Sequence, residues 1–457
     1  MNCKGNTMNI KQHLRKLSQS QILSFGFITL ILLGTILLML PVSSAEGVPT
    51  NFIDCLFTAT SATCVTGLTI FDTGTYWSTF GQLVIITLIQ IGGVGFMSLT
   101  TIVFLMLGRK ISIKNRMLIQ SSLSLDSAEG IVKYVKSVLM FTFITECIGA
   151  VLLFTRFVRD YPLMKAVYFS VFHSVSAFCN AGFDIFGGGI SLMGYTSSPT
   201  VTLTISMLIV LGGIGFTVAM DVLEKKGFRK LSFNSKIVLS TTLTLLIFGF
   251  VFMLFSEYNN SATIGNMPLW EKILTSLFAS VTPRTAGFFS IDYSKVTTIG
   301  YLVTIILMFI GGSPGSTAGG IKTSAIAVIL VSVYSTVKGR DDMNIFGRRI
   351  TEQTLRKAFV MAFMPFVWTI FAVMIISMTN SLPLHDILFE TVSAIATVGL
   401  TTGITTKLNA LGKILIAMSM FFGRVGIMTI AYAIARKRED INAETSSFRY
   451  PEGNLML

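Results

Sequence analysis

The sequence predicts an all-α polytopic membrane protein that is built from four helix–loop–helix repeats. Three observations predict this fold. The chain has several long apolar stretches without charge, a short glycine motif occurs four times, and a second glycine motif follows each copy of the first. Recurrence of two motifs in step indicates that one structural unit is used four times along the chain.

Composition places the chain in a membrane. Of its 457 residues 52% are hydrophobic and 12% are charged, which is about half the charged fraction of soluble domains. A helix that crosses a bilayer needs about 20 apolar residues. Five uncharged stretches reach that length: Leu17 to Ala45, Ser78 to Leu107, Ser191 to Met220, Ile237 to Ser256 and Ala358 to Pro383.

The positive charge is arranged as in a membrane protein and does not indicate nucleic-acid binding. The formal net charge is +13, and 25 of the 35 lysines and arginines fall in five patches beside apolar stretches. These patches are residues 1–20, 108–136, 224–236, 338–357 and 434–457. Basic residues of this kind mark the cytosolic side. We therefore expect a multi-pass protein of the cell membrane with both termini in the cytosol, in contact with lipid and not with nucleic acid.

The first repeated motif is a run of small residues that ends in glycine and then leucine or phenylalanine. Its four copies are TATSATCVTGL, FHSVSAFCNAGF, FASVTPRTAGF and FETVSAIATVGL, and their glycines are Gly67, Gly182, Gly287 and Gly399. The second motif reads IGGVGF, LGGIGF, IGGSPG and FGRVGI, and its first glycines are Gly92, Gly212, Gly311 and Gly423. Close helix packing explains each second motif singly, but it does not explain why the two motifs stay in phase.

Each repeat is expected to contain a spanning helix, a short half-helix with a loop, and a second spanning helix. The segment from Phe52 to Cys64 is too short to cross a bilayer, so it must re-enter from the outside. Non-helical backbone survives at that depth only when it is buried or faces water. The expected units are a tail at 1–20, repeats at 21–107, 131–222, 235–336 with a broken second helix, and 357–435, and a tail at 436–457.

The four glycine loops have the properties of a cation filter. Backbone carbonyls replace the water of a dehydrated cation without fixed charge, and glycine permits the unusual dihedral angles that this requires. Four loops around one axis would make a central pore like that of a tetrameric potassium channel, from a single chain. The expected filter residues are Val65, Thr66, Gly67, Asn180, Ala181, Gly182, Thr285, Ala286, Gly287, Thr397, Val398 and Gly399.

With these motifs the sequence resembles the Ktr/Trk/HKT superfamily, and in particular the Ktr-type membrane subunits of bacterial potassium uptake. The resemblance rests on the four filter segments, the run GSPGSTAGGIKTS at 312–324 and Arg424, and it covers residues 20–435. It implies a homodimer in the bacterial cytoplasmic membrane, with potassium as the transported ion. It also implies a separate cytosolic ring of RCK-type nucleotide-binding subunits that respond to ATP and ADP, since no nucleotide-binding motif occurs in this chain.

The segment GGSPGSTAGG cannot hold a regular helix, because glycine is flexible and proline lacks a donor. A simple kink would explain it. The alternative is a loop across the pore whose hydroxyls obstruct ions, which is the intramembrane gate that the resemblance implies. The expected gate residues are Gly311, Gly312, Ser313, Pro314, Gly315, Ser316, Thr317, Ala318, Gly319, Gly320 and Lys322.

A few charged residues lie within or beside apolar segments. Arg424 replaces the second glycine of the second motif and is expected to face the pore or the gate, although a structural ion pair is an alternative. Asp54, Asp386 and Glu390 precede filter loops, where they would either stabilise helix starts or attract cations. His173 stands at the position equivalent to Glu390 and is expected to be a packing residue.

Two other functions compete with a pore. An enzyme is disfavoured, because the three histidines are dispersed and no catalytic or metal-binding cluster is evident. A secondary carrier for cations or small solutes that works by alternating access is the stronger alternative, since carriers also use repeats and broken helices. Sodium-linked and passive transport are both compatible with the sequence.

Overall fold

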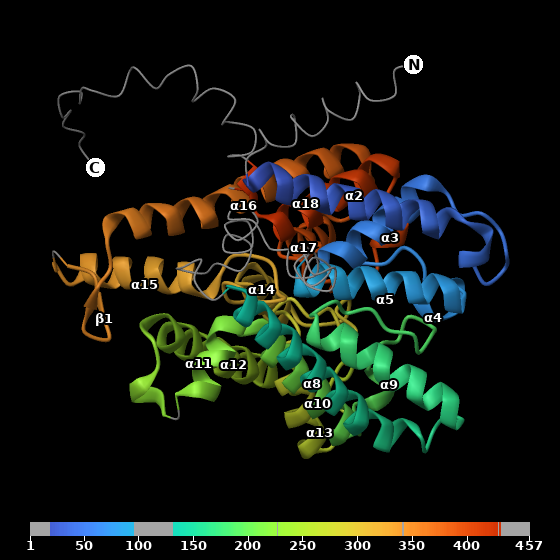
Figure 1. The fold of residues 1–457 in the computed structure, drawn as a ribbon, viewed down its shortest axis with the longest axis horizontal. Helices are drawn as coiled ribbons and strands as arrows, with labels where there is room; N and C mark the ends of the chain where they lie inside the picture. The colour runs from blue at the N-terminus through green and yellow to red at the C-terminus, as the bar shows by residue number, and fades with distance from the viewer. Residues whose placement is uncertain (1–18, 96–130, 226, 341, 428, 431–457) are drawn as a thin grey trace.

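A computed structural model describes residues 19–95, 131–225, 227–340, 342–427 and 429–430, and the described chain is mostly helical (Figure 1). The first repeat contains α2 (Gln19–Met39), α3 (Phe52–Cys64), α4 (Thr73–Tyr76) and α5 (Thr79–Val94). The second contains α8 (Ile131–Phe157), α9 (Leu163–Phe178), α10 (Pro199–Gly213) and α11 (Phe216–Glu224). The third contains α12 (Phe233–Glu257), α13 (Leu269–Val281), α14 (Thr298–Phe309) and α15 (Thr323–Val337). The fourth contains α16 (Glu352–Thr379), α17 (Leu384–Ile395) and α18 (Ala410–Val425).

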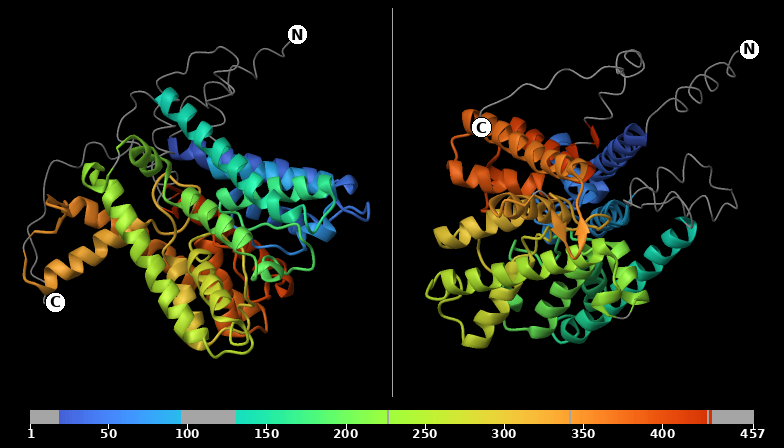
Figure 2. Two further views of the ribbon diagram at one scale, coloured as in Figure 1. Left: turned by 90° about the horizontal axis from the view of Figure 1, so that it is seen from below. Right: turned by 90° about the vertical axis from the view of Figure 1, so that its left-hand side faces the viewer.

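A short antiparallel hairpin of β1 (Asn344–Ile345) and β2 (Arg348–Arg349) joins α15 to α16. Single 3₁₀ turns lie at Pro41–Ser43, Met193–Tyr195, Phe228–Lys230 and Thr405–Lys407. The two helices α15 and α16 pack together and project with the hairpin from the body of the molecule (Figures 1 and 2).

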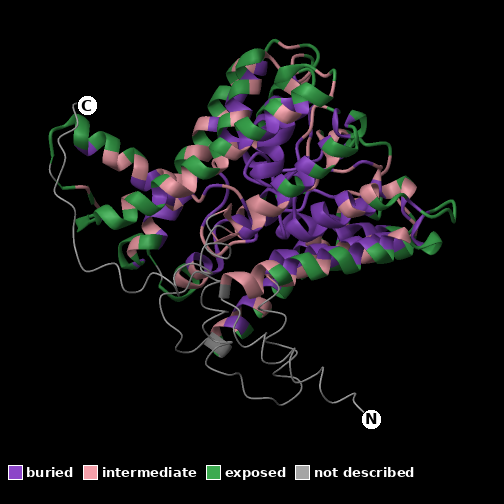
Figure 3. Ribbon diagram, turned by 90° about the horizontal axis from the view of Figure 1, so that it is seen from above, coloured by how far each residue is buried: buried purple, intermediate pink, exposed green. Residues whose placement is uncertain are grey.

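Each repeat begins with a long outer helix. Within the described residues, α2, α8, α12 and α16 are long and apolar enough to span a membrane, and the bent pair α10 and α11 would make a fifth span. These outer helices expose large apolar side chains, including Phe143, Phe255 and Met378. The expected half-helices are α3, α9, α13 and α17, and their last turns are buried at the centre (Figure 3). An apolar exterior around a small-residue interior is the arrangement of a helical membrane protein.

The four repeats form a closed ring. Within each repeat the long outer helix packs on its own half-helix, as α2 does on α3 and α8 on α9. The second helix of each repeat packs on the half-helix of the next one. These pairs are α5 with α9, α10 with α13, α14 with α17, and α18 with α3. The last pair closes the ring between the fourth repeat and the first, so the half-helices surround one central axis.

The second helices start at matched caps. The side chains of Ser78, Thr297 and Asn409 each accept a hydrogen bond from the backbone N–H of the glycine three residues later. Such caps satisfy N–H groups that a helix start leaves without a partner. The second repeat uses Pro199 at its first helical position instead. These caps stabilise the starts of the second helices in the first, third and fourth repeats.

The structure corrects the expectation of one span from Ser191 to Met220. The helix stops after Gly213 and resumes at Phe216 at an angle of 99°. Gly215 has a φ of +94°, and the N–H of Phe216 donates to the carbonyl of Gly315 at 2.9 Å. The Gly315 carbonyl, which belongs to the third repeat, thus accepts from an N–H group that would bond within the helix if the helix were continuous.

The sequence predicted a broken second helix only in the third repeat. The structure shows that the second helices of other repeats also end at the equivalent position. The helix α5 ends before Gly95, and α18 ends before Gly426, and both glycines have positive φ angles, of 91° and 88°. The expected span to Leu107 continues into residues 96–130, which lie outside the described residues. The tail 436–457 and most of the tail 1–20 lie outside them too.

Candidate functional site

The four expected filter loops share one backbone conformation. Each half-helix ends a few residues before its glycine, and the residue two places before that glycine is in the left-handed region. The φ angles are 59° at Val65, 60° at Asn180, 68° at Thr285 and 52° at Thr397. The glycines have φ angles of 98° at Gly67, 71° at Gly182, 78° at Gly287 and 90° at Gly399. A left-handed non-glycine residue is uncommon and requires support from its surroundings.

Hydroxyl groups of the half-helices provide that support. The Ser61 hydroxyl accepts from the N–H of Gly67 at 3.1 Å, and the Ser393 hydroxyl accepts from the N–H of Gly399 at 3.0 Å. In the other two repeats the hydroxyls of Ser176 and Thr282 donate to the carbonyls just after the glycines, those of Phe183 and Phe288. Each loop is therefore tied to its own helix by a side chain that our sequence reasoning missed, although a hydroxyl recurs near this position in every repeat.

The loops converge on one axis. If each glycine carried a Cβ atom, that atom would strike the carbonyl oxygen before the glycine of the neighbouring loop. These contacts run from Gly67 to Ala181, from Gly182 to Ala286, from Gly287 to Val398 and from Gly399 to Thr66. The same order around the axis follows from the helix packing. The Cβ position at Gly287 also lies 3.3 Å from the Thr66 oxygen of the opposite loop, so the ring is narrow.

The electrostatics of the ring favour a positive ion. The half-helices α3, α9, α13 and α17 all point their C-terminal ends at the loops, and a helix C-terminus carries a partial negative charge. The twelve loop residues contain no charged side chain. Carbonyl dipoles without a fixed anion suit a dehydrated monovalent cation.

The segment between α14 and α15, residues 310–322, is not helical, and we call it the crossing loop. Its ends are joined by a parallel bridge between Ile310 and Ile321. Its backbone N–H groups at Ser313 and Thr317 donate to the carbonyls of Gly213 and Gly212, at 3.0 and 3.2 Å. The crossing loop therefore occupies the break between α10 and α11, and more than a helix kink is present.

The crossing loop also lies against two filter loops. The Thr317 hydroxyl donates to the carbonyl of Phe178 at 3.2 Å and lies 3.3 Å from the amide of Asn180. On the other side, a Cβ at Gly319 would strike the side chain of Thr397. The hydroxyls of Ser313 and Ser316 are hydrogen-bonded to Thr323 and to the Ser313 carbonyl. The hydroxyls of Ser313 and Thr317 thus bond to neighbouring segments, and the hydroxyl of Ser316 bonds within the crossing loop itself.

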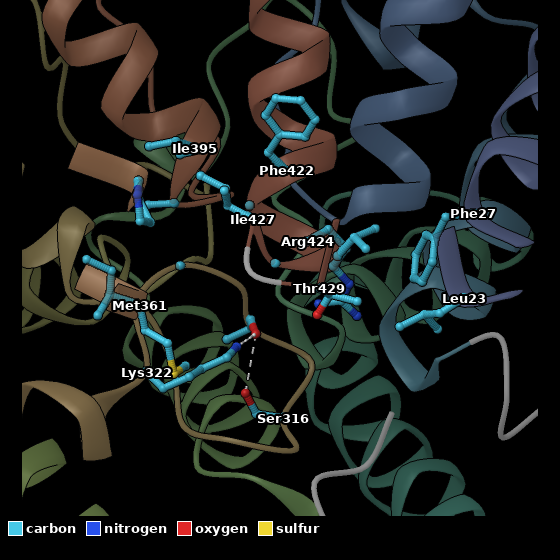
Figure 4. Close-up of a pocket in the computed structure, with 18 of the residues that line it drawn as sticks. Leu23, Phe27, Ser316, Lys322, Met361, Ile395, Phe422, Arg424, Ile427 and Thr429 are labelled. Carbon is cyan, nitrogen blue, oxygen red and sulfur yellow. Dashed lines mark hydrogen bonds between the residues drawn. The ribbon is translucent and has the colours of Figure 1, made fainter. Parts of the chain in front are cut away.

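Arg424 connects the crossing loop to the first repeat. Its guanidinium donates to the carbonyls of Thr317, Gly92 and Gly93. The structural ion pair considered for Arg424 is not found within the described residues. The Lys322 ammonium donates to the Ala318 carbonyl at 2.9 Å. Both side chains line a cavity of about 390 Å³ beside the crossing loop, and Leu23, Phe27 and Met361 line it from the outer helices α2 and α16 (Figure 4).

The second glycine motif has a packing role that explains its phase. A Cβ at Gly92, Gly212 or Gly423 would strike the carbonyl of Thr63, Phe178 or Ile395. In each case that carbonyl lies four residues before the filter glycine. Only glycine lets the second helix approach this closely. In the third repeat Gly311 meets Gly319 of the crossing loop instead.

The carboxylates before the filter loops have different surroundings. Asp54 forms an ion pair of 2.7 Å with Lys413 of α18, while Asn51 is the residue that caps α3. Glu390 is buried and accepts hydrogen bonds from the hydroxyls of Thr401 and Thr405. These two acids hold neighbouring segments together.

The remaining polar residues singled out near the loops are accounted for as follows. Asp386 lies in the first turn of α17, as expected for a residue that stabilises a helix start. His173 is fully buried and stacks on Phe186 at 4.0 Å, which agrees with a packing residue. Two further acids, which are not among those residues, also have partners: Glu146 accepts from Gln90 at 3.2 Å, and Asp221 pairs with Lys225 at 2.9 Å.

Comparisons with known proteins agree with this architecture. The family model of TrkH, described as cation transport proteins, matches residues 4–444. The chain is similar to the potassium/sodium uptake protein NtpJ of Enterococcus hirae, with 40% identity over 453 residues, 98% of this chain and 99% of that one. It is 40% identical over 435 residues to the Ktr system potassium uptake protein B of Bacillus subtilis, which covers 95% and 96% of the two chains.

A solved structure shares the fold. The crystal structure of the potassium transporter TrkH from Vibrio parahaemolyticus matches with a TM-score of 0.68 at 17% identity, over 89% of this chain and 84% of that one. The predicted all-α polytopic fold is thereby confirmed. The expectation of a transporter in place of an enzyme is confirmed too, since the matching proteins carry the names of ion transporters.

Proposed function

Since the chain belongs to the TrkH family of cation transport proteins, we propose that it takes up potassium ions through a single filter formed by its four glycine loops. The protein acts in the cytoplasmic membrane of a bacterium, with both termini in the cytosol. The names of NtpJ and of the Ktr protein support potassium as the ion. The name of NtpJ also contains sodium, so sodium is the second ion to test.

The observation that carries this proposal is the ring of contacts among the four loops. Each filter glycine lies against the carbonyl of its neighbour, in one closed order around an axis. A ring of backbone oxygens can replace the hydration shell of a cation. We know of no comparable feature in the described residues that favours the alternating-access carrier. All four loops have the same conformation and contact one another in a single ring, as a pore requires.

We assign the crossing loop as the gate of this path. It lies between the filter loops of the second and fourth repeats, and Arg424 holds it to the first. The basic side chains of Lys322 and Arg424 line the cavity, where positive charge raises the energy of a passing cation. Movement of the crossing loop away from the axis would lower both the steric and the electrostatic barrier.

Regulation is proposed to come from a cytosolic ring of RCK-type subunits that bind ATP or ADP, beneath a homodimer of this chain. Two basic segments of the chain lie together and support such a docking site. Phe228 packs edge-on against Phe346 at 6.2 Å, and Arg348 lies 6.0 Å from the ring of Phe233. Exposed Arg229, Lys230 and Arg348 form this basic surface.

Reversing charge on this basic surface is expected to weaken docking of the ring. The double substitution Arg229→Glu and Lys230→Glu should reduce affinity about tenfold, because charged rims steer and hold complementary partners. Pull-down and titration of the purified ring against the two proteins measure the change. Lys407→Glu is the matched control, since Lys407 is exposed on the turn that follows the fourth filter loop. Equal affinity for the double variant and the control would contradict the docking site.

The transport proposal is tested by ion flux. Purified protein in liposomes, with and without the regulatory ring, should carry potassium faster than sodium down an imposed gradient. Uptake by a bacterial strain without other potassium importers provides the cellular measurement. Flux that requires stoichiometric exchange with a second solute would favour the carrier, and absence of potassium flux in both assays would overturn the proposal.

A further inference from the structure

A second buried arginine lies beside the filter, in the third repeat. Arg284 directly precedes the filter residue Thr285, and its side chain is only 7% exposed. It forms no ion pair with a carboxylate in the part of the chain that the structure describes. A buried charge without a partner is costly, so this arginine needs an explanation that its position alone does not provide.

The guanidinium of Arg284 joins the three parts of its repeat. Its Nη1 donates to the Thr242 carbonyl of α12, and its Nη2 donates to the Gly311 carbonyl in the crossing loop, both at 3.4 Å. Gly311 is the second residue after the end of α14 and lies at the start of the crossing loop. A guanidinium is a planar fork with five donors, so it can bridge two carbonyls in a way that an ammonium group cannot.

The equivalent positions in the other repeats show that the filter itself does not need this arginine. They are occupied by Cys64, Cys179 and Ala396, although all four loops have the same backbone conformation. The third repeat is also the one whose second helix gives way to the crossing loop. The arginine therefore belongs to the same repeat as the crossing loop, which begins at that repeat's second motif.

We infer that Arg284 is a positioning residue that couples the third filter loop to the crossing loop, so that an ion in the filter and the placement of the crossing loop affect each other. This inference rests on the proposed potassium filter. An ion that orders Thr285 also orders the attached guanidinium, and through Gly311 the start of the crossing loop. Coupling of this kind is reciprocal in free energy.

The test measures the crossing loop without measuring transport. Ser316 lines the cavity, so Ser316→Cys reports how readily a water-soluble thiol reagent reaches the crossing loop. Its modification rate is followed by peptide mass spectrometry on the full-length protein, in potassium and in choline. We expect potassium to change the rate about fivefold when Arg284 is present, at the lower end of typical coupling between sites.

Arg284→Lys retains the charge but loses the fork, and should reduce the potassium effect on the modification rate to less than twofold. Arg284→Gln should do the same. Cys64→Ala, at the matched position of the first repeat, should retain the full effect. An unchanged potassium effect in Arg284→Lys would overturn the coupling, as would equal loss in Cys64→Ala.

Thermal stabilisation by potassium separates this inference from the proposed function. If potassium stabilises the protein but leaves the Ser316→Cys rate unchanged, the coupling fails and the filter stands. If potassium has no effect on stability while Arg284→Lys accelerates modification in choline, the filter proposal fails and Arg284 remains the anchor of the crossing loop.

Discussion

Serine at Gly287 is expected to lower the preference of the protein for potassium over sodium about tenfold, which corresponds to about 1.4 kcal/mol of lost discrimination. The φ angle of Gly287 is +78°, and a new Cβ would lie 2.8 Å from the Val398 oxygen and 3.0 Å from the Cα of Gly182. Three of the four filter loops must therefore shift to accept it. Displaced carbonyls no longer match one ion size better than another. Permeability ratios from liposome flux in paired potassium and sodium gradients measure the change.

A matched control separates crowding from backbone strain. Gly47 has a φ of +71°, and no atom of the described residues lies within 4 Å of its Cβ position. Gly47→Ser thus introduces the same unfavourable dihedral angle away from the filter, at a cost of about 1–3 kcal/mol. It should leave the permeability ratio unchanged. An unchanged ratio in Gly287→Ser, in protein that is properly inserted, would remove the third loop from the filter.

Deletion of residues 313–318 is expected to raise potassium flux about tenfold without the regulatory ring, the effect of lowering a barrier by about 1.4 kcal/mol. The ends that remain are already neighbours, since the Gly312 N–H donates to the Gly319 carbonyl at 3.2 Å. The deletion therefore shortens the crossing loop without separating α14 from α15. It also removes Thr317, which contacts the second filter loop and accepts from Arg424. Potassium flux into liposomes provides the measurement.

Arg424→Gln distinguishes release of the crossing loop from damage to the fold. Arg424 binds the carbonyls of Thr317 and Gly92 through two separate nitrogens, whereas glutamine offers one uncharged amide nitrogen on a shorter side chain. This variant should therefore also raise flux, by a smaller factor than the deletion. The ratio of potassium to sodium permeability should stay as it is in the unmodified protein. If both variants transport more slowly than the unmodified protein despite normal insertion, the crossing loop is a support for the filter and not its gate.

Local sequence signals were reliable where they reflected backbone freedom. The half-helix predicted up to Cys64 ends at Cys64, and all four filter glycines have the positive φ angles for which glycine is suited. The two motifs recur in phase in the sequence, and the close approach of Gly92 to the Thr63 carbonyl provides a physical reason. These properties depend on a few neighbouring residues, so they are visible in the sequence.

Contacts between residues that are far apart in the sequence could not be predicted from the sequence. Nothing near Arg424 in sequence indicates that it binds Gly92 and Gly93, which lie more than 300 positions earlier. The same holds for the ion pair of Asp54 with Lys413. The break at Gly215 was missed, and the hydrogen bond beside it, from the N–H of Phe216 to the carbonyl of Gly315, joins two different repeats.

The sequence by itself determined that one unit is repeated four times, which glycines lie in the loops after the half-helices, and which residues are small enough to let backbones meet. Only the tertiary structure decided the order of the units around the axis, the position of the crossing loop between other repeats, and the carbonyls that Arg284 and Arg424 bind. Backbone freedom is a property of each residue, whereas the choice of a distant partner depends on how all four units close into a ring.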